Sequence, residues 1–338
     1  MSSPARKKRA DSGSAGSTPP RVDPAESGLL PPEHWSQLPE WRGMVITTDC
    51  EKGSYRRYWP RGNGYQLMVL ISSHHVLTLL LGDKLHLAPV PDDIQTAVDI
   101  GTGTGIWAIV LQAHTNLREF ADKFPNASVI GTDLAPIQPG WIPPNLEFQI
   151  EDCTQQWTFQ PNSFDYIHMR WLVGSIADWK SLFKEAYKCL KPGGYIESYE
   201  PSSRVESDDG TVLPGSALSQ WEKFFVEGGR KIGRQFTIFE ENIQREGMRE
   251  AGFVNIEERD FKNHVGGWPK DPKQRSVGQY MQAAFEQDAK GTVLHMATAL
   301  GWTEEEITVF ISHFRHEIRS PKIHSYFRQK VVWGRKPL

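Results

Sequence analysis

Short apolar segments alternate with amphipathic segments through the middle of the chain. Each of five runs is rich in Val, Ile, Phe or Tyr and is short enough to be a buried strand. Residues 178–190 instead place apolar side chains at helical spacing, and the letters KPGG that follow are typical of a helix end. Strands that alternate with helices in this way predict crossover connections and a parallel sheet. The predicted strands are residues 97–100, 127–133, 146–152, 164–169 and 195–200.

Beyond residue 200 the pattern is mainly helical. Thr303 is followed three residues later by Glu306, the spacing of a capping box at the start of a helix. We expect these helices to form a cap over an acceptor site or a partner surface. An apolar run at 67–82 is interrupted by two serines and two histidines and is short for a membrane span, so we interpret it as a buried helix. The predicted elements are helices at 216–233, 237–252, 277–301 and 303–320, and strands at 253–261 and 324–334.

Composition separates a polar N-terminal segment from a globular remainder. The 338 residues carry a net charge of −3 and are 38% apolar, which indicates a soluble protein without a globally basic, nucleic-acid-binding character. Residues 1–40 begin with a stretch rich in Ser, Pro and Gly and are predicted to be a disordered tail. Four basic residues, Arg6–Arg9, resemble a nuclear localisation signal, although a solubilising tail would look similar. We expect no signal peptide and no membrane span.

The three cysteines, Cys50, Cys153 and Cys189, lie far apart and form no CxxC pair. This spacing argues against a zinc site or a disulfide framework and favours a reducing compartment. We therefore expect no metal.

The most specific chemical signal is the segment VDIGTGTGIWA at 98–108. Gly101 and Gly103 allow a tight turn and close approach of a ligand to the backbone, and Gly105 is expected to open a helix whose amides face the same space. Dinucleotide sites prefer GxGxxG, whereas here GxGxG follows Asp99, a carboxylate that disfavours a pyrophosphate. A cationic ligand such as S-adenosylmethionine suits that acid. An ordinary strand–helix turn is the alternative.

Two more acids follow the next predicted strands. Asp133 can accept hydrogen bonds from both hydroxyls of a ribose, although it follows Asp99 by 34 residues (133 − 99) rather than the roughly 20 of dinucleotide folds. Asp152 is placed to meet an adenine amino group, with the amide of Cys153 beside it. Ligands of parallel sheets bind at the carboxyl ends of strands, where all three acids lie. A helix N-cap or a solvated loop position is the alternative for each acid alone.

Several motifs together resemble those of class I S-adenosylmethionine-dependent methyltransferases: VDIGTGTGIWA, VIGTDLAP, FQIEDC, FDYIHMRWL and LKPGGYIE. HHVLTLLLGDKLHLAP, HMRWLVGSIADW, GGWPKDP and the terminal GRKP resemble, more narrowly, the fungal LaeA-like, velvet-associated group. The resemblance covers residues 41–338. It implies an α/β, doubly wound, Rossmann-like sheet of seven strands, parallel except for a reversed last strand, plus a helical cap. Its parts would be an N-terminal helical segment (41–97), a cofactor-binding core (98–200), and the cap with the last strands (201–338).

The same resemblance implies a setting and a set of site residues. It implies S-adenosylmethionine as cofactor, a nuclear location with shuttling to the cytoplasm left open, and a role in secondary metabolism, sporulation and development. Implied partners are velvet-type regulators or a related methyltransferase subunit, without direct nucleic-acid binding. The implied cofactor contacts are Asp99, Gly101, Thr102, Gly103, Thr104, Gly105, Asp133, Leu134, Asp152, Cys153, Met169 and Arg170.

Methyl transfer requires little beyond alignment, so candidate catalysts are few. His168 is a candidate general base, with a packed histidine beneath the adenosine pocket as the favoured alternative. Glu197 and Glu200 are candidates for the substrate side of the site or for a solvated rim.

One departure from the family pattern leaves a second function open. Relatives often carry acids and an arginine before the paired histidines, but no acid lies between Pro60 and His74 here. A weakly active or inactive subunit that acts as a partner-binding regulator is therefore the alternative to an enzyme. A nicotinamide oxidoreductase is disfavoured, because its pyrophosphate would lie beside Asp99.

Overall fold

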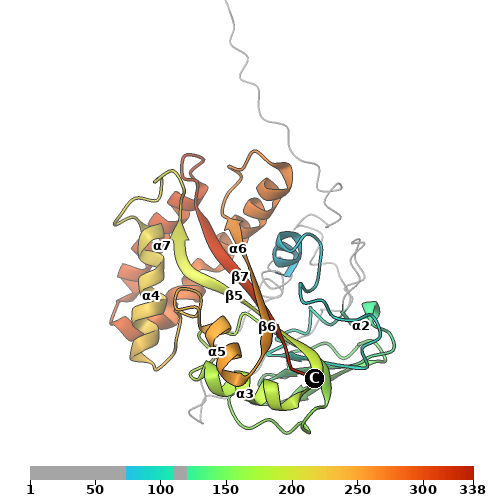
Figure 1. Ribbon diagram of the computed structural model, residues 1–338. Coiled ribbons are helices and arrows are strands. Elements are labelled where there is room, and N and C mark those ends of the chain that lie inside the picture. Colours follow the sequence, from blue (N-terminus) through green and yellow to red (C-terminus); the bar gives the residue numbers. More distant parts are fainter. Residues whose placement is uncertain (1–73, 110–119) are drawn as a thin grey trace, which may run out of the picture. The chain divides into compact units, whose positions relative to one another are not determined.

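A seven-stranded sheet organises the molecule (Figure 1). The computed structural model describes residues 74–109 and 120–338. The strand order is β3-β2-β1-β4-β5-β7-β6. Strands β1 to β5 pair in parallel, and β7 runs antiparallel to both β5 and β6. The strands are β1 (Thr96–Ile100), β2 (Ser128–Asp133), β3 (Leu146–Ile150), β4 (Phe164–Arg170), β5 (Leu190–Glu206), β6 (Val254–His264) and β7 (Tyr326–Arg335). The predicted sheet with a reversed last strand is confirmed.

The helices follow the prediction with shifted ends. α5 begins six residues later than expected, because Asn242 adopts a left-handed conformation (φ 55°) just before it. α6 begins five residues earlier, where Asp271 caps it and a proline fills the first helical position. The helices are α2 (Phe120–Lys123), α3 (Trp179–Cys189), α4 (Ala217–Lys231), α5 (Ile243–Ala251), α6 (Pro272–Leu300) and α7 (Glu304–Arg319).

Two expected helices lie partly outside the described residues. Residues 74–80 of the apolar run at 67–82 are helical, and residues 67–73 of that run lie outside the described residues. Residues 106–109, after the glycines, form turns in which the amides of Ala108 and Ile109 donate to the carbonyl of Gly105, at 2.9 and 3.0 Å. The tail at 1–40, the basic cluster and Cys50 also lie outside the described residues.

Side chains alternate between two cores, one on each face of the sheet. We call the face that carries Val331 the front face; it packs against the segment at 77–88 and Trp107. Val332, the next residue of β7, packs on the opposite face with α3 and α5. The alternation of strand side chains therefore assigns each residue of β7 to one core or the other.

A third core holds the helical cap together. α4, α6 and α7 contact one another beside the extended ends of β5 and β7 (Figure 1). Trp221 of α4 stacks on Phe314 of α7 at 4.3 Å between ring centroids, and Phe285 of α6 lies 5.2 Å from Phe327 of β7. The predicted cap is present, anchored to the sheet through β7.

The predicted capping box of α7 is confirmed. The amide of Glu306 donates to Thr303 Oγ1, and the amide of Thr303 donates to Glu306 Oε2, at 3.2 and 2.8 Å. Thr303→Ala is expected to lower the free energy of unfolding by about 1 kcal/mol, because it leaves one amide of the first turn without its partner. Urea unfolding measures this. Thr308→Ala, an exposed change inside α7, is the control, and an equal loss there would contradict the capping role.

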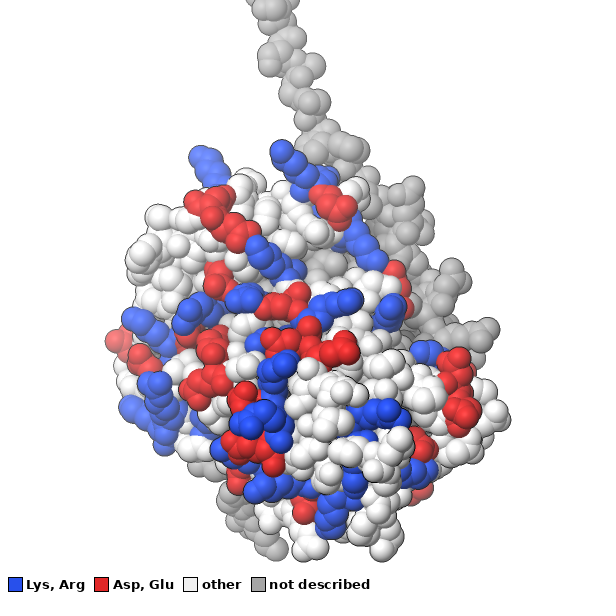
Figure 2. Space-filling view, in the orientation of Figure 1, with Lys and Arg blue, Asp and Glu red and all other residues white. Residues whose placement is uncertain are grey.

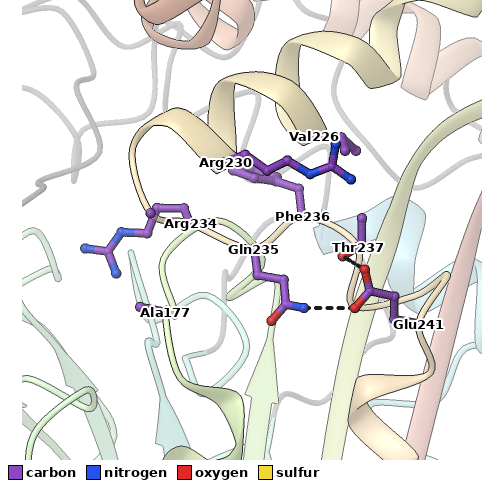
Figure 3. Close-up of a pocket in the computed structure, with 9 residues that line it drawn as sticks. Ala177, Val226, Arg230, Arg234, Gln235, Phe236, Thr237 and Glu241 are labelled. Atoms are coloured by element: carbon purple, nitrogen blue, oxygen red, sulfur yellow. Dashed lines mark hydrogen bonds between the residues drawn. The ribbon is translucent and has the colours of Figure 1, made fainter.

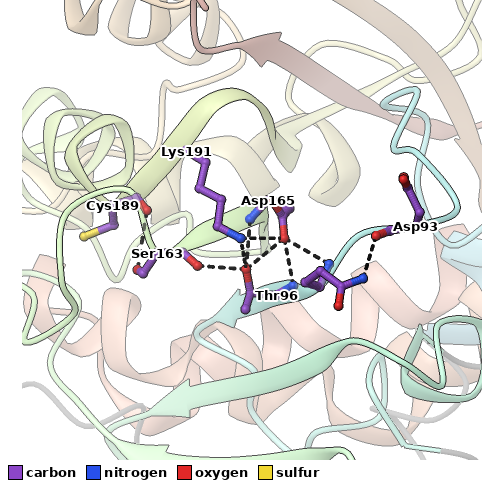
Figure 4. A network of polar contacts seen from close by, with 7 residues as sticks. Asp93, Thr96, Ser163, Asp165, Cys189 and Lys191 are labelled. Atoms are coloured by element: carbon purple, nitrogen blue, oxygen red, sulfur yellow. Dashed lines mark hydrogen bonds and ion pairs between the residues drawn. The ribbon is translucent and has the colours of Figure 1, made fainter.

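A polar network fixes the strands at the end of the sheet opposite the glycine turn (Figure 4). Asp165 Oδ2 accepts hydrogen bonds from the amides of Gln95 and Thr96 and from Lys191 Nζ, all within 3.0 Å. Burial would raise the pKa of Asp165, but these hydrogen bonds outweigh it and hold the pKa below its ordinary value. The network joins β1, β4 and β5, and the resulting register places Asp99 beside His168.

The surface mixes charges of both signs. In the face shown in Figure 2, Lys and Arg are interspersed with Asp and Glu. Pairs such as Lys180–Glu250 and Arg245–Glu258 contribute to this pattern, with N–O distances of 2.9 and 3.4 Å. Within 74–109 and 120–338, no helix is long and apolar enough to cross a membrane.

Candidate functional site

The glycine turn follows β1 and leaves open space at one position. Gly101, Gly103 and Gly105 all have positive φ. A Cβ at Gly105 would lie 2.3 Å from Phe148 Cζ, so this glycine is required for packing against β3. A Cβ at Gly103 would meet nothing within 4 Å. Gly103 is therefore the position where a ligand can approach the backbone.

Asp99 anchors this turn. Its side chain is 3% exposed, Thr102 Oγ1 donates to Oδ2 at 2.6 Å, and His168 Nδ1 lies 2.7 Å from Oδ1. The buried Thr104 completes the turn. Because both carboxylate oxygens already have protein partners, Asp99 acts on a ligand through its negative charge and through the shape it gives the turn.

Asp133, the last residue of β2, faces the same turn. Its Oδ2 accepts the amide of Gly103 at 2.8 Å, and its Oδ1 accepts the amide of Ala135 at 3.0 Å. A carboxylate held at this distance from Gly103 can exchange such bonds for those of a ribose diol. Leu134 follows and is 45% exposed. Gln138, which the sequence did not single out, donates from Nε2 to the carbonyl of Gly103 at 2.5 Å.

Asp152 and Cys153 follow β3 as predicted. Asp152 Oδ1 accepts from the amide and the hydroxyl of Thr154, at 2.9 and 2.6 Å, which forms a tight turn. The carbonyl of Cys153 accepts from Trp157 Nε1 at 3.1 Å. Burial raises the pKa of the Cys153 thiol to about 12, so the sulfur stays protonated and unreactive.

At the end of β4 three consecutive side chains have different surroundings. His168 is 1% exposed and stacks on Trp107 at 3.9 Å. Met169 is buried in the core that faces α3 and α5. Arg170 Nη2 lies 3.1 Å from His74 Nδ1. Sequence reasoning did not single out His74, which lies in the helical segment 74–80.

The surroundings of His168 favour the packed-histidine interpretation. Burial lowers the pKa of His168, although Asp99 opposes the shift, so the ring is neutral at pH 7. Trp107 covers one face of the ring and also stacks on Phe120 at 4.4 Å. Because the ring is buried and its Nδ1 already meets Asp99, we assign His168 to the support of the turn.

Glu197 and Glu200 are not on a solvated rim, and that expectation was wrong. Both are fully buried. Glu197 Oε2 accepts the amides of Leu87 and Ala88, at 2.8 and 2.6 Å. Glu200 accepts the amides of Leu172 and Val173, at 3.0 and 2.9 Å. β5 continues to Glu206, so both acids lie inside the strand, where they fix the backbone of neighbouring segments.

Glu197 makes stability depend on pH. Burial raises its pKa from 4.5 to about 7, against the opposing hydrogen bonds from Ala88 and Leu87. The folded state therefore holds a proton that the unfolded state releases near pH 4.5. The stability contributed by this group is present below about pH 4.5 and is lost as the pH rises through about 7.

Relative to Glu197→Gln, the wild type is expected to lose about 2 kcal/mol of unfolding free energy between pH 5 and pH 8. Urea unfolding of both proteins measures it, and parallel pH profiles would contradict it.

A separate cavity of about 260 Å³ lies where α4 ends (Figure 3). Gln235 and Thr237 both donate to the carboxylate of Glu241 at its edge, at 3.1 and 2.7 Å. The lining contains Ala177, from the loop that follows β4, but none of the predicted cofactor residues. Among the described residues, no group of three or more His, Cys, Asp and Glu could hold a metal ion.

Sequence comparisons place the chain in a family of known proteins. Residues 73–258 match a family model described as a methyltransferase domain. Methyltransferase pytC of Aspergillus terreus is 36% identical over 266 residues, which cover 78% of each chain. Secondary metabolism regulator LAE1 of Cochliobolus heterostrophus is 32% identical over 271 residues, which cover 78% of this chain and 85% of that protein. A solved structure of Haemonchus contortus phosphoethanolamine N-methyltransferase 2 with S-adenosyl-L-methionine aligns with a TM-score of 0.42 and 19% identity, over 72% of this chain and 49% of that chain.

Proposed function

From the premise that this chain belongs to the methyltransferase-domain family, in its fungal LaeA-like group, we propose that its methyl transfer serves a nuclear complex controlling secondary metabolism and development. The chain is an S-adenosylmethionine-dependent methyltransferase linked to the regulation of secondary metabolism. The nuclear complex and the developmental role are the proposed part.

The observation that carries the enzymatic part is the pair formed by Gly103 and Asp133. Gly103 has open space above it, and Asp133 Oδ2 accepts its amide at 2.8 Å, while Oδ1 accepts the amide of Ala135. These residues fit an adenosine. Asp133 would bind the ribose, Asp152 would bind the adenine amino group, and the glycine turn would bind the rest of the cofactor. When bound, S-adenosylmethionine supplies a methyl group activated by a sulfonium. The protein supplies alignment and excludes water.

The basic cluster Arg6–Arg9 supports the nuclear part of the proposal, and the names of the regulator relatives support the regulatory part. The test is microscopy of the full chain fused to a fluorescent protein in a filamentous fungus. Exchange of Lys7 and Lys8 for alanine is expected to shift the protein to the cytoplasm and to lower metabolite output. Exclusion of the unaltered fusion from nuclei would overturn this part.

A partner-binding regulator without required catalysis is the second candidate. The sequence between Pro60 and His74, which lies outside the described residues and carries no acid, favours it. Asp133→Ala separates the two candidates. Lost cofactor affinity with unchanged metabolite output would favour the regulator, whereas loss of both would favour the enzyme.

A further inference from the structure

Three buried polar groups on the front face of the sheet carry an oxygen without a hydrogen-bond partner among the described residues. Tyr199 of β5, Gln329 of β7 and Asn263 of β6 are each 1% exposed or less. The hydroxyl of Tyr199, Oε1 of Gln329 and Oδ1 of Asn263 accept or donate no hydrogen bond among the described residues. A buried carbonyl oxygen without a partner is costly and calls for an explanation.

Strand register places these groups on one face. Tyr199 is opposite Val331, two residues along β7 from Gln329, and Asn263 is opposite Phe327, two residues the other way. Residues two apart on a strand share a face, and diagonal neighbours on paired strands are within reach of long side chains. Gln329 is therefore the diagonal neighbour of both Tyr199 and Asn263, and we call this row of three residues across β5, β7 and β6 the polar patch.

Two separate covers meet over this patch. Val331 and Tyr199 belong to the same hydrophobic core as Leu77 and Leu81 of the N-terminal segment. On the other side, α6 covers Asn263, whose Nδ2 lies 3.5 Å from Met281 Sδ. The two covers touch where the rings of His75 and Tyr280 meet edge to face at 5.3 Å. Along β7, Gln329 lies between Val331 and Phe327, the positions opposite Tyr199 and Asn263.

A strained aromatic residue borders the same region. Trp171 follows β4 directly, has a φ of 59°, and donates its amide to the carbonyl of Tyr199 at 3.0 Å. A left-handed conformation is unfavourable for a bulky side chain and is concentrated at functional sites. The strained backbone therefore holds Trp171 directly after the carboxyl end of β4 and beside Tyr199.

We propose that Tyr199, Gln329 and Asn263 form the seat of the methyl acceptor, and that it takes a small, neutral, largely apolar molecule with a hydroxyl or N–H group. This inference rests on the proposed methyltransferase function. The two amide oxygens can only accept hydrogen bonds, so they select an acceptor that donates them. The surrounding Trp171, Val331 and Phe327 offer apolar contact rather than charge. Burial lowers the pKa of His75 to about 4, which leaves that ring neutral as well.

The test uses 1-naphthol as a neutral donor probe and 1-methoxynaphthalene as its match without the O–H. Binding is followed by ligand-observed NMR on the full chain saturated with S-adenosylhomocysteine. Gln329→Leu is expected to weaken 1-naphthol binding about tenfold and to leave 1-methoxynaphthalene unchanged. S-adenosylhomocysteine affinity should stay within twofold. The melting temperature should hold or rise, because the variant removes a buried, unpaired carbonyl.

Gln149→Leu, on β3 at the far edge of the sheet, is the control and should change neither probe. If Gln329→Leu does not fold, Asn263→Leu takes its place. Unchanged 1-naphthol binding in a folded variant would mean that the oxygens hold only buried water, and it would overturn the seat. Failure of the wild type to bind 1-naphthol at millimolar concentration while S-adenosylhomocysteine binds would also overturn it. Failure to bind S-adenosylhomocysteine would instead overturn the proposed function.

Discussion

Exchange of Asp133 for alanine is expected to lower the affinity for S-adenosylhomocysteine by at least about 100-fold. Hydrogen bonds to a charged group contribute about 1.5–3 kcal/mol each, and a ribose diol makes two of them. The carboxylate already lies 2.8 Å from the Gly103 amide, so little rearrangement is needed for it to meet a ligand over the turn. Isothermal titration calorimetry of both proteins measures the change.

Two controls make the Asp133 result specific. Glu147→Ala removes an exposed acid from the neighbouring strand β3 and should leave the affinity unchanged. Asp133→Asn keeps one acceptor oxygen and should give an intermediate loss. Because Asp133→Ala also leaves the amides of Gly103 and Ala135 unpaired, circular dichroism must first establish that it is folded. A loss below threefold in a folded variant would contradict the ribose role.

Gly105→Ala is expected to cost about 2–4 kcal/mol of unfolding free energy. The added Cβ would lie 2.3 Å from Phe148 Cζ and 2.9 Å from Ile109 Cδ1, at a backbone φ of 78°. Overpacking of a core costs about 1–3 kcal/mol, and the left-handed conformation adds about 1 kcal/mol for a residue with a Cβ. Urea unfolding measures the sum.

Gly103→Ala is the matched comparison. It has a similar positive φ of 60°, but its Cβ would point into open space, so we expect a loss of only about 1 kcal/mol. Gly103→Ala should instead lower the affinity for the cofactor, because the alanine side chain occupies the space that a ligand needs. Equal stability losses at the two glycines, or full cofactor affinity in Gly103→Ala, would contradict this division of roles.

The elements that the sequence predicted well are those governed by local chemistry. The five apolar runs became adjacent strands, and the Thr303–Glu306 pair marked the start of α7 because capping depends on residues three apart. The start of α5 was missed, since a left-handed Asn242 is set by the tertiary contacts around it and not by helical spacing. The length of β5 was missed because its polar continuation pairs with β7, more than 100 residues away.

The site residues also separate into those that local sequence predicts and those that only tertiary contacts determine. Acids at strand ends could be predicted, because parallel strands bring their carboxyl ends together. The burial of Glu197 could not, because its partners are the backbone amides of Leu87 and Ala88, which carry no signal in the side-chain sequence. The stacking of His168 on Trp107 likewise depends on how β4 and the glycine turn meet.

The most direct test of the central claim is a calorimetric titration of the full chain with S-adenosylmethionine, S-adenosylhomocysteine and NAD. The glycine turn, Asp99 and Asp133 predict one site per chain for the first two ligands, with dissociation constants on the order of micromolar, and none for NAD. Absence of binding at millimolar S-adenosylmethionine, or tighter binding of NAD, would contradict the account.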